Sequence, residues 1–237
     1  MSNQINATFS SGLMKQYNLF FLVSILLIGC GVMSCSKDDN NEEPHVIDYG
    51  HVPVGVEAVD LGLPSGTKWA SCNIGATAPE EYGDYYAWAE TETKDRYNGD
   101  NYIYALGSGG PFKDLGIVIS KTEYDVARAK WGGDWQMPTK RDYQELLENC
   151  KYNYTTMKGV RGGRFTSKKN GNSIFLPAAG NQWDQGLSHD GKNGCSWSGQ
   201  MYENGQADAI NLSIYKESIV DVRSRTDGCS VRPVIKD

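Results

Sequence analysis

The sequence is poor in the residues on which most metal and catalytic sites depend. It contains 3 histidines, and two of them, His45 and His51, lie in a polar stretch near the N-terminus. No phosphate-binding loop, dinucleotide-binding turn or nucleophile elbow occurs in a strand-to-helix context. His189 and Asp190 are neighbours in an expected loop, which favours a solvated pair over half of a metal site. We therefore predict no catalytic residue, no metal and no cofactor, and a protein that is not an enzyme.

An excess of basic charge is also missing. The chain has 23 Lys and Arg residues against 29 Asp and Glu residues, which gives a net charge of −6. Nucleic-acid binding requires a clustered basic face, and attachment to an anionic membrane through charge requires a polybasic segment. The composition therefore argues against a nucleic-acid partner, and it implies that any membrane attachment is covalent.

No apolar run is long enough to cross a bilayer. The longest, residues 19–33 (LFFLVSILLIGCGVM), is shorter than the roughly 20 residues that a membrane-spanning helix needs. It follows Met14 and Lys15, and a short apolar segment behind a basic residue is typical of a signal peptide. We predict that residues 1–34 are a lipoprotein signal peptide, with Met14 as a candidate for the true initiator. The alternative is a short membrane anchor that is retained.

Two cysteines, Cys30 and Cys35, follow a small residue and so resemble the cleavage site of a lipoprotein. Cys35 is followed by SKDD, which is similar to the surface-export signal of lipoproteins in gut-type Bacteroidota, whereas Cys30 is followed by more apolar residues. We therefore predict lipid on Cys35, where each buried methylene contributes about 0.8 kcal/mol. The predicted location is the outer membrane, anchored by lipid and exposed at the cell surface. Residues 35–53 are acidic and poor in apolar residues, and they are predicted to form a flexible tether.

Residues 54–237 are predicted to form one domain. Helices are expected from the N-cap signals at Thr122 and Thr139, the second with Tyr143, Leu146, Leu147 and Cys150 on one face. Residues 92–116 have the composition of a long surface insertion. The expected strands are residues 56–61, 68–73, 85–88, 160–167, 173–176, 196–198, 209–213, 219–223 and 231–235. This order, without alternation of strand and helix, indicates an α+β fold with mainly antiparallel pairing.

A series of motifs along this domain resembles a known family. The motifs are VDLGLPSGTKWA (59–70), NIGA (73–76), EEYGDYYAWAET (80–91), WQMPT (135–139), NGNSIFLPAAG (170–180), WS (197–198) and VRPV (231–234). Together they are similar to the Fibrobacter succinogenes major paralogous domain, which is common in bacterial surface lipoproteins. The resemblance implies a C-type-lectin-like fold, with two helices, a small twisted antiparallel sheet and long loops. It also implies that Trp135 and Trp197 are packing residues.

The resemblance bears on the four cysteines that follow Cys35. Cys195 and Cys229 stand where the family usually has aromatic residues, so a joint replacement favours a disulfide between them. Cys72 and Cys150 are a weaker second pair. The alternative is four buried free thiols.

The loop of residues 180–195 is the predicted binding region, because loops on a rigid scaffold commonly carry recognition. Trp183 and Asp184 are its candidate ligand contacts. We expect a non-catalytic lectin-like module that recognises glycan or protein at the cell surface. The alternatives are a structural or tip subunit of a surface fibre and, on fold analogy alone, an enzyme of the formylglycine-generating type.

Overall fold

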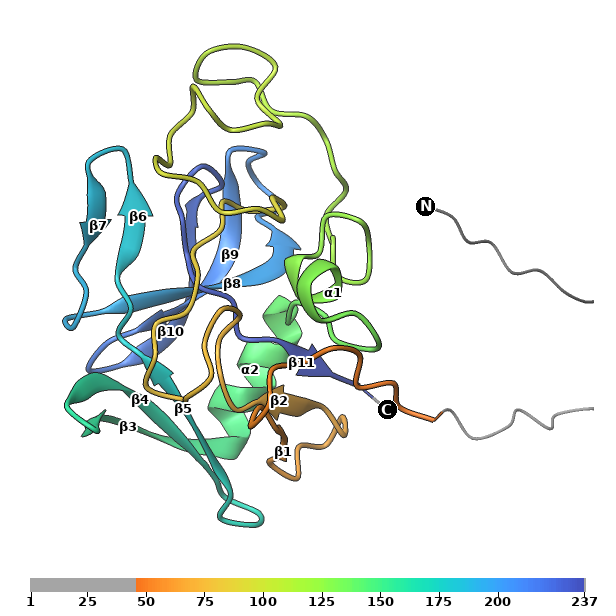
Figure 1. The fold of residues 1–237 in the computed structure, drawn as a ribbon, viewed down its shortest axis with the longest axis vertical. Coiled ribbons are helices and arrows are strands. Elements are labelled where there is room, and N and C mark those ends of the chain that lie inside the picture. The colour runs from red at the N-terminus through yellow and green to blue at the C-terminus, as the bar shows by residue number, and fades with distance from the viewer. Residues whose placement is uncertain (1–45, 237) are drawn as a thin grey trace, which may run out of the picture. The chain divides into compact units, whose positions relative to one another are not determined.

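The structure is a computed structural model that describes residues 46–236, and within them it has two helices and four small antiparallel sheets (Figure 1). The helices are α1 (Val126–Trp131) and α2 (Lys140–Asn149). The first sheet has the order β1 (Ala58–Asp60), β2 (Lys68–Ala70), β11 (Val234–Ile235). The second has the order β3 (Cys150–Met157), β4 (Val160–Ser167), β5 (Ser173–Pro177). The third has the order β10 (Ser218–Ser224), β9 (Asp208–Ile214), β8 (Gly194–Met201), and a hairpin joins β6 (Asn181–Trp183) to β7 (Gly186–Ser188). The α+β class predicted from the sequence is confirmed.

Capping residues set the starts of both helices. Thr139 and Asp142 form the reciprocal capping box that the sequence predicts for α2. The prediction that Thr122 caps the first helix is wrong, because its hydroxyl donates to the Ile119 carbonyl in the preceding turn. Asp125 is the N-cap instead, and its buried carboxylate accepts hydrogen bonds from the amides of Ala127 and Arg128. It also accepts from the amides of residues 121 and 137, and so joins α1 to the chain on both sides.

The strand predictions succeed where a local turn signal exists. The hairpin of β4 and β5 turns at Asn170 and Gly171 as expected, and β1 pairs with β2 around residues 64–66. Residues 85–88 form no strand, since Tyr86 makes a single bridge to Cys229. Residues 150–157 form β3, for which the sequence analysis has no counterpart.

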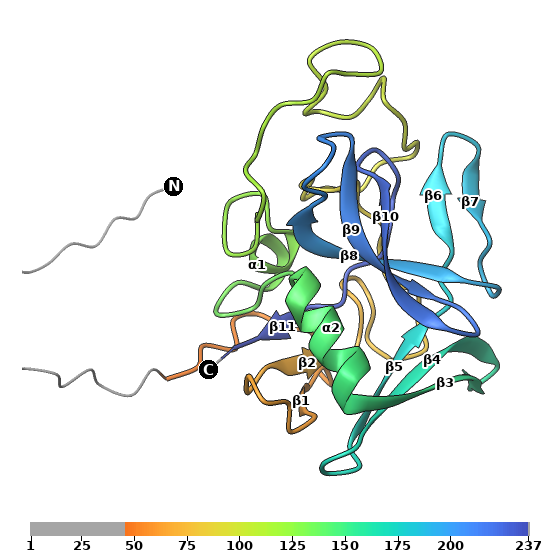
Figure 2. The same ribbon diagram turned by 180° about the vertical axis from the view of Figure 1, so that it is seen from behind.

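Helix α2 packs against the β8–β9–β10 sheet and against β3 and β4 (Figure 2). Its buried residues Tyr143 and Leu146 join the apolar cluster that Trp69 and Phe165 also enter. A second cluster surrounds Trp88, Trp135 and Trp197, which are all nearly inaccessible to solvent. Trp135 and Trp197 are therefore packing residues, as expected.

The predicted tether, residues 35–53, is corrected at its C-terminal end. The lipidation site Cys35 and the signal peptide lie outside the described residues. From residue 47 onward, however, the chain contacts the domain: Ile47 and Val52 pack on the core, and the His51 amide donates to the Trp131 carbonyl. The indole of Trp135 donates to the Tyr49 carbonyl over 3.0 Å. These contacts mean that the folded domain begins several residues earlier than the composition indicates.

The cysteines divide into one bonded pair and two free thiols. Cys195 and Cys229 form a disulfide, as the sequence predicts. The predicted second pair is wrong, because Cys72 and Cys150 are both free and buried. Cys150 lies in the apolar cluster with Phe165, where burial raises the pKa of its thiol to about 11, and Cys72 lies in the part of the core that holds Arg232.

Within residues 46–236, no helix combines the length and the apolar character that a membrane crossing requires.

Candidate functional site

A pocket of about 280 Å³ opens between the β6–β7 hairpin and the end of β10. We call it the hairpin pocket. Its lining combines one large aromatic ring with several polar side chains: Asn181, Trp183, Ser188, His189, Asn193, Arg223 and Asp227. The predicted binding region, residues 180–195, supplies five of these seven residues, so the structure builds a concave site largely from that segment.

Backbone pairing and the disulfide hold the walls of the hairpin pocket together. Gln182 and Gly228 exchange two backbone hydrogen bonds, of 2.7 and 2.8 Å. The Cys195–Cys229 disulfide joins the chain just after Asn193 to the chain just after Asp227. Gly180 allows the close approach, because a Cβ at this position would lie 2.2 Å from the Ser188 carbonyl oxygen. The hairpin is therefore fixed to the scaffold at its base.

Trp183 lies at the end of β6 with 43% of its surface exposed. Its partner across the hairpin is Gly186, which has no side chain to cover the indole ring. An exposed tryptophan face is costly to leave in water and is a common platform for ligands that are apolar on one side. The structure thus places the predicted contact Trp183 at the pocket.

Asp184, the other predicted contact, does not line the hairpin pocket. Its carboxylate accepts a hydrogen bond of 2.7 Å from the Asn98 amide and forms an ion pair with Arg96. The hydrogen bond from Asn98, followed by that from Arg96, lowers the pKa of Asp184. Asp184 therefore connects the hairpin to the long insertion of residues 92–116.

The pocket contains polar groups that a ligand could contact, one of which has no partner within the described part of the chain. The Arg223 Nε atom is buried and has no partner, although Nη1 of the same side chain contacts Asp227 Oδ2 at 3.1 Å. Asn181 also lines the pocket and is buried, with 7% of the residue's surface exposed. Burial raises the pKa of Asp227, which the neighbouring Arg223 opposes. A ligand that offers both donors and acceptors would satisfy these groups.

His189 is an exposed residue of the pocket lining with a strained backbone conformation. Its φ of 62° lies in the left-handed region, which costs a residue with a Cβ about 1 kcal/mol or more. The Ser188 hydroxyl and His189 Nδ1 are 2.8 Å apart. A serine–histidine pair resembles a nucleophile with its base, but a hydrolytic triad also needs a carboxylate on the other nitrogen. Among residues 46–236, no carboxylate makes that hydrogen bond.

Sequence reasoning missed Asn181, Arg223 and Asp227. Arg223 belongs to an expected strand and Asp227 to a turn, and nothing in either local pattern marks a binding residue. Tertiary folding brings them to the hairpin from more than thirty residues further along the chain. Within the part of the chain that the structure describes, no group of three or more His, Cys, Asp or Glu side chains could hold a metal ion.

No protein-family model matches the chain, and no curated protein or solved structure matches it either. The function is therefore argued from the hairpin pocket together with the sequence.

Proposed function

We propose that the chain is a lipid-anchored protein of the outer membrane whose domain binds glycans at the cell surface without catalysis. In this proposal residues 1–34 are removed, Cys35 carries the lipid, and the hairpin pocket is the binding site. The fold is C-type-lectin-like, and the pair of helices beside small antiparallel sheets supports that part of the proposal. The family resemblance of the motifs between residues 59 and 234 supports the same assignment.

The observation that carries the proposal is the exposed ring of Trp183 beside polar side chains, among them Arg223, whose Nε atom has no partner among the described residues. Sugars have an apolar face of C–H groups and a rim of hydroxyls that both donate and accept hydrogen bonds. The indole can stack on the apolar face, while Asn181, Arg223 and Asp227 can bond to the hydroxyls. The partly buried ion pair of Arg223 and Asp227 offers a donor and an acceptor together, which suits a neutral diol.

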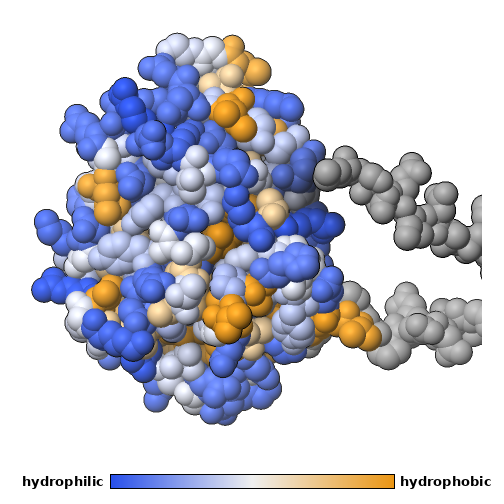
Figure 3. Space-filling view, in the orientation of Figure 1, coloured by the Kyte–Doolittle hydropathy of each residue, from blue (hydrophilic) through white to orange (hydrophobic). Residues whose placement is uncertain are grey.

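One face of the domain favours a glycan over a broad protein interface. On the face shown in Figure 3, hydrophobic side chains form small separate islands within a hydrophilic surface. A stable protein interface usually has a contiguous apolar centre. A pocket of about 280 Å³ is close to the lower limit for small-molecule sites, which agrees with a ligand of one or a few sugar rings.

A glycan-binding screen tests the proposal. Residues 36–237 of the wild type, of Trp183→Ala and of Tyr49→Ala are applied to an array of bacterial, plant and mucosal glycans. Tyr49 is the matched control, since it is an aromatic side chain of similar exposure (47%) that lies outside the pocket. We expect Trp183→Ala to lower the affinity for bound glycans at least ten-fold, or about 1.4 kcal/mol, and Tyr49→Ala to leave it unchanged.

Two results would contradict the proposal. One is undiminished binding by Trp183→Ala, and the other is the absence of any bound glycan, with a protein partner recovered in its place. The anchor is tested separately by mass spectrometry of the native protein, where an unmodified Cys35 would overturn it.

A further inference from the structure

A cluster of tyrosines lies beside the hairpin pocket, across the turn that connects β7 to β8. We call Tyr82, Tyr154, Tyr215 and the nearby Arg161 the tyrosine patch. The Tyr154 hydroxyl donates to the Lys192 carbonyl over 2.7 Å. The Tyr82 hydroxyl would lie 3.8 Å from a Cβ placed at Gly191. Both contacts fall on residues 189–193, the same short segment whose first and last residues line the pocket.

The register of β3 and β4 explains why these side chains gather. Tyr152 and Tyr154 are two residues apart on β3 and therefore point to the same face of the sheet. Their partners on β4 are Phe165 and Gly163, and Arg161 follows on the same face. Phe165 is fully buried, Tyr154 is partly buried and Arg161 is exposed. The same face of the sheet is therefore covered by the core at Phe165 and reaches solvent beyond Tyr154.

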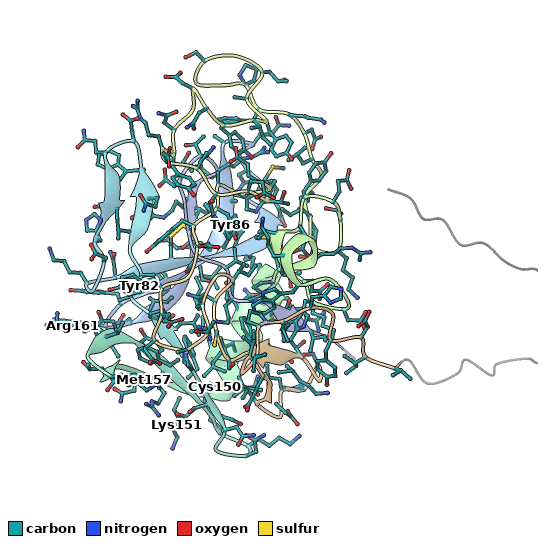
Figure 4. All side chains as sticks on the ribbon, in the orientation of Figure 1. Tyr82, Tyr86, Cys150, Lys151, Met157 and Arg161 are labelled. Atoms are coloured by element: carbon teal, nitrogen blue, oxygen red, sulfur yellow. A yellow bond between two sulfur atoms is a disulfide. The ribbon has the colours of Figure 1, made fainter. Side chains whose placement is uncertain are left out.

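The turn after β9 completes the tyrosine patch. Tyr215 is 48% exposed, and its ring centroid lies 6.0 Å from that of Tyr154. Tyr152 fixes this turn, because its hydroxyl donates to the Tyr215 carbonyl. Arg161 forms no ion pair with another described residue. Figure 4 places Tyr82 and Arg161 on the flank of the molecule that carries β6 and β7.

We propose that the tyrosine patch is a second part of the same binding site, and that the preferred ligand is an oligosaccharide whose chain continues from the hairpin pocket over residues 189–193 onto these tyrosines. The inference rests on the proposed function, because it needs a sugar at Trp183. Aromatic rings and an unpaired arginine are the side chains that bind successive sugar units, by stacking and by hydrogen bonds to hydroxyls. A ligand confined to the pocket would leave the patch unused.

Binding measurements with oligosaccharides of increasing length test the inference. The probes are cello-, manno- and galacto-oligosaccharides from one to six units, titrated into residues 36–237 by calorimetry. In the series that binds, we expect the affinity to rise at least ten-fold between the shortest and the longest probe. Tyr215→Ala should lower the affinity for the longest probe about three- to ten-fold, the range that one aromatic contact contributes, and should not change binding of the shortest.

Two further variants separate the inference from the proposed function. Trp183→Ala should weaken binding of every length, and Tyr49→Ala should weaken none. The same affinity at all lengths, or an unchanged affinity of Tyr215→Ala for the longest probe, would overturn the inference and leave the pocket as a glycan site. Failure of every probe to bind the wild type would overturn the inference for these ligands, and failure of the glycan array as well would overturn the proposed function. Thermal unfolding of Tyr215→Ala, expected to match the wild type, shows that the variant is folded.

Discussion

Two fully buried arginines, Arg232 and Arg225, mark two regions of the domain that are constructed differently. Every nitrogen of the Arg232 guanidinium is hydrogen-bonded: Nε donates to the Asn73 side chain, Nη1 to the carbonyls of Ala70 and Ser71, and Nη2 to the Phe175 carbonyl. These acceptors lie at the end of β2 and in β5. Burial lowers the pKa of Arg232 to about 10. Arg232 thus ties regular strands together by a complete set of hydrogen bonds.

Arg225 serves the other region with an incomplete set. Its Nε donates to the Tyr102 hydroxyl and Nη1 to the carbonyls of residues 113 and 206, but Nη2 is buried without a partner among the described residues. The charge is instead surrounded by aromatic rings, with centroids 4.8 Å away for Trp88, 5.3 Å for Tyr102 and 5.5 Å for Phe112. Two of these rings belong to the insertion of residues 92–116, which contains no named strand or helix.

The difference shows how an irregular loop can be held to a scaffold without a strand ladder. Around Arg232 the backbone itself supplies the acceptors, so the arginine can be placed only where strands already lie in register. Around Arg225 two hydrogen bonds to backbone carbonyls are combined with cation–π attraction and apolar packing between side chains, and these side-chain contacts tolerate variation in the backbone path. We expect the first region to have the greater local stability and the second to open at a lower free-energy cost.

The largest effect is expected from Arg232→Met. The substitution leaves three carbonyls and the Asn73 side-chain oxygen buried without a donor, so we expect the free energy of unfolding to fall by about 3–5 kcal/mol. Urea denaturation of the purified domain measures this change. Arg141→Met on the exposed face of α2 is the control and should stay within about 0.5 kcal/mol of the wild type. If Arg232→Met lowered the free energy of unfolding by less than about 1 kcal/mol, the hydrogen bonds of Arg232 would not distinguish its region from that of Arg225.

Arg225→Met is expected to have an intermediate effect. Methionine keeps an unbranched side chain against the three rings and removes the unpartnered Nη2, while the lost hydrogen bonds and cation–π contacts destabilise by about 1–3 kcal/mol. Hydrogen exchange should accelerate mainly in residues 92–116. A loss equal to that of Arg232→Met, spread evenly over the domain, would show that the two regions unfold as one.

The smallest effect is expected from Asp184→Ala, which detaches the insertion from the β6–β7 hairpin. Because the contacts with Arg96 and Asn98 are exposed, the melting temperature should not change, whereas exchange of the amides near residues 96–101 should become faster. Asp184→Asn loses the ion pair but keeps an acceptor for Asn98. Its amide exchange rates should therefore lie between those of the wild type and those of Asp184→Ala. Raising the salt concentration screens the ion pair, so the exchange rates of the wild type should approach those of Asp184→Asn. Identical exchange in all three proteins would show that the insertion is held by its aromatic contacts alone.

The parts of the fold that follow from the sequence are those with a local cause. The capping residue Thr139 and the Asn170–Gly171 turn act on their neighbours within a few residues, and the structure agrees with both predictions. Strands β6 and β7 are three residues each, which is too short to show an alternating pattern. The sequence around them has the composition of a loop. They are ordered by Gly228, which lies far along the chain and pairs with Gln182.

The candidate site follows the same rule. Trp183 is recognisable because a large aromatic in a stretch rich in Gly, Asn and Asp has few local packing partners. Arg223 and Asp227 become part of the pocket through the disulfide and the pairing at Gly228, and neither position carries a local signal. The contacts of Asp184 have the same origin, since its partners Arg96 and Asn98 come from an insertion whose path has no local signal in the sequence.

The position of β11 has a consequence for the orientation of the whole domain. This last strand pairs with β2, so the first and last strands of the domain share one sheet, and the chain before β1 contacts residues 131–135 nearby. The β6–β7 hairpin lies on the opposite side in both views (Figures 1 and 2). A support coupled to the side of the domain where residue 46 lies would therefore leave the β6–β7 hairpin on the opposite side, where large or insoluble material can reach it.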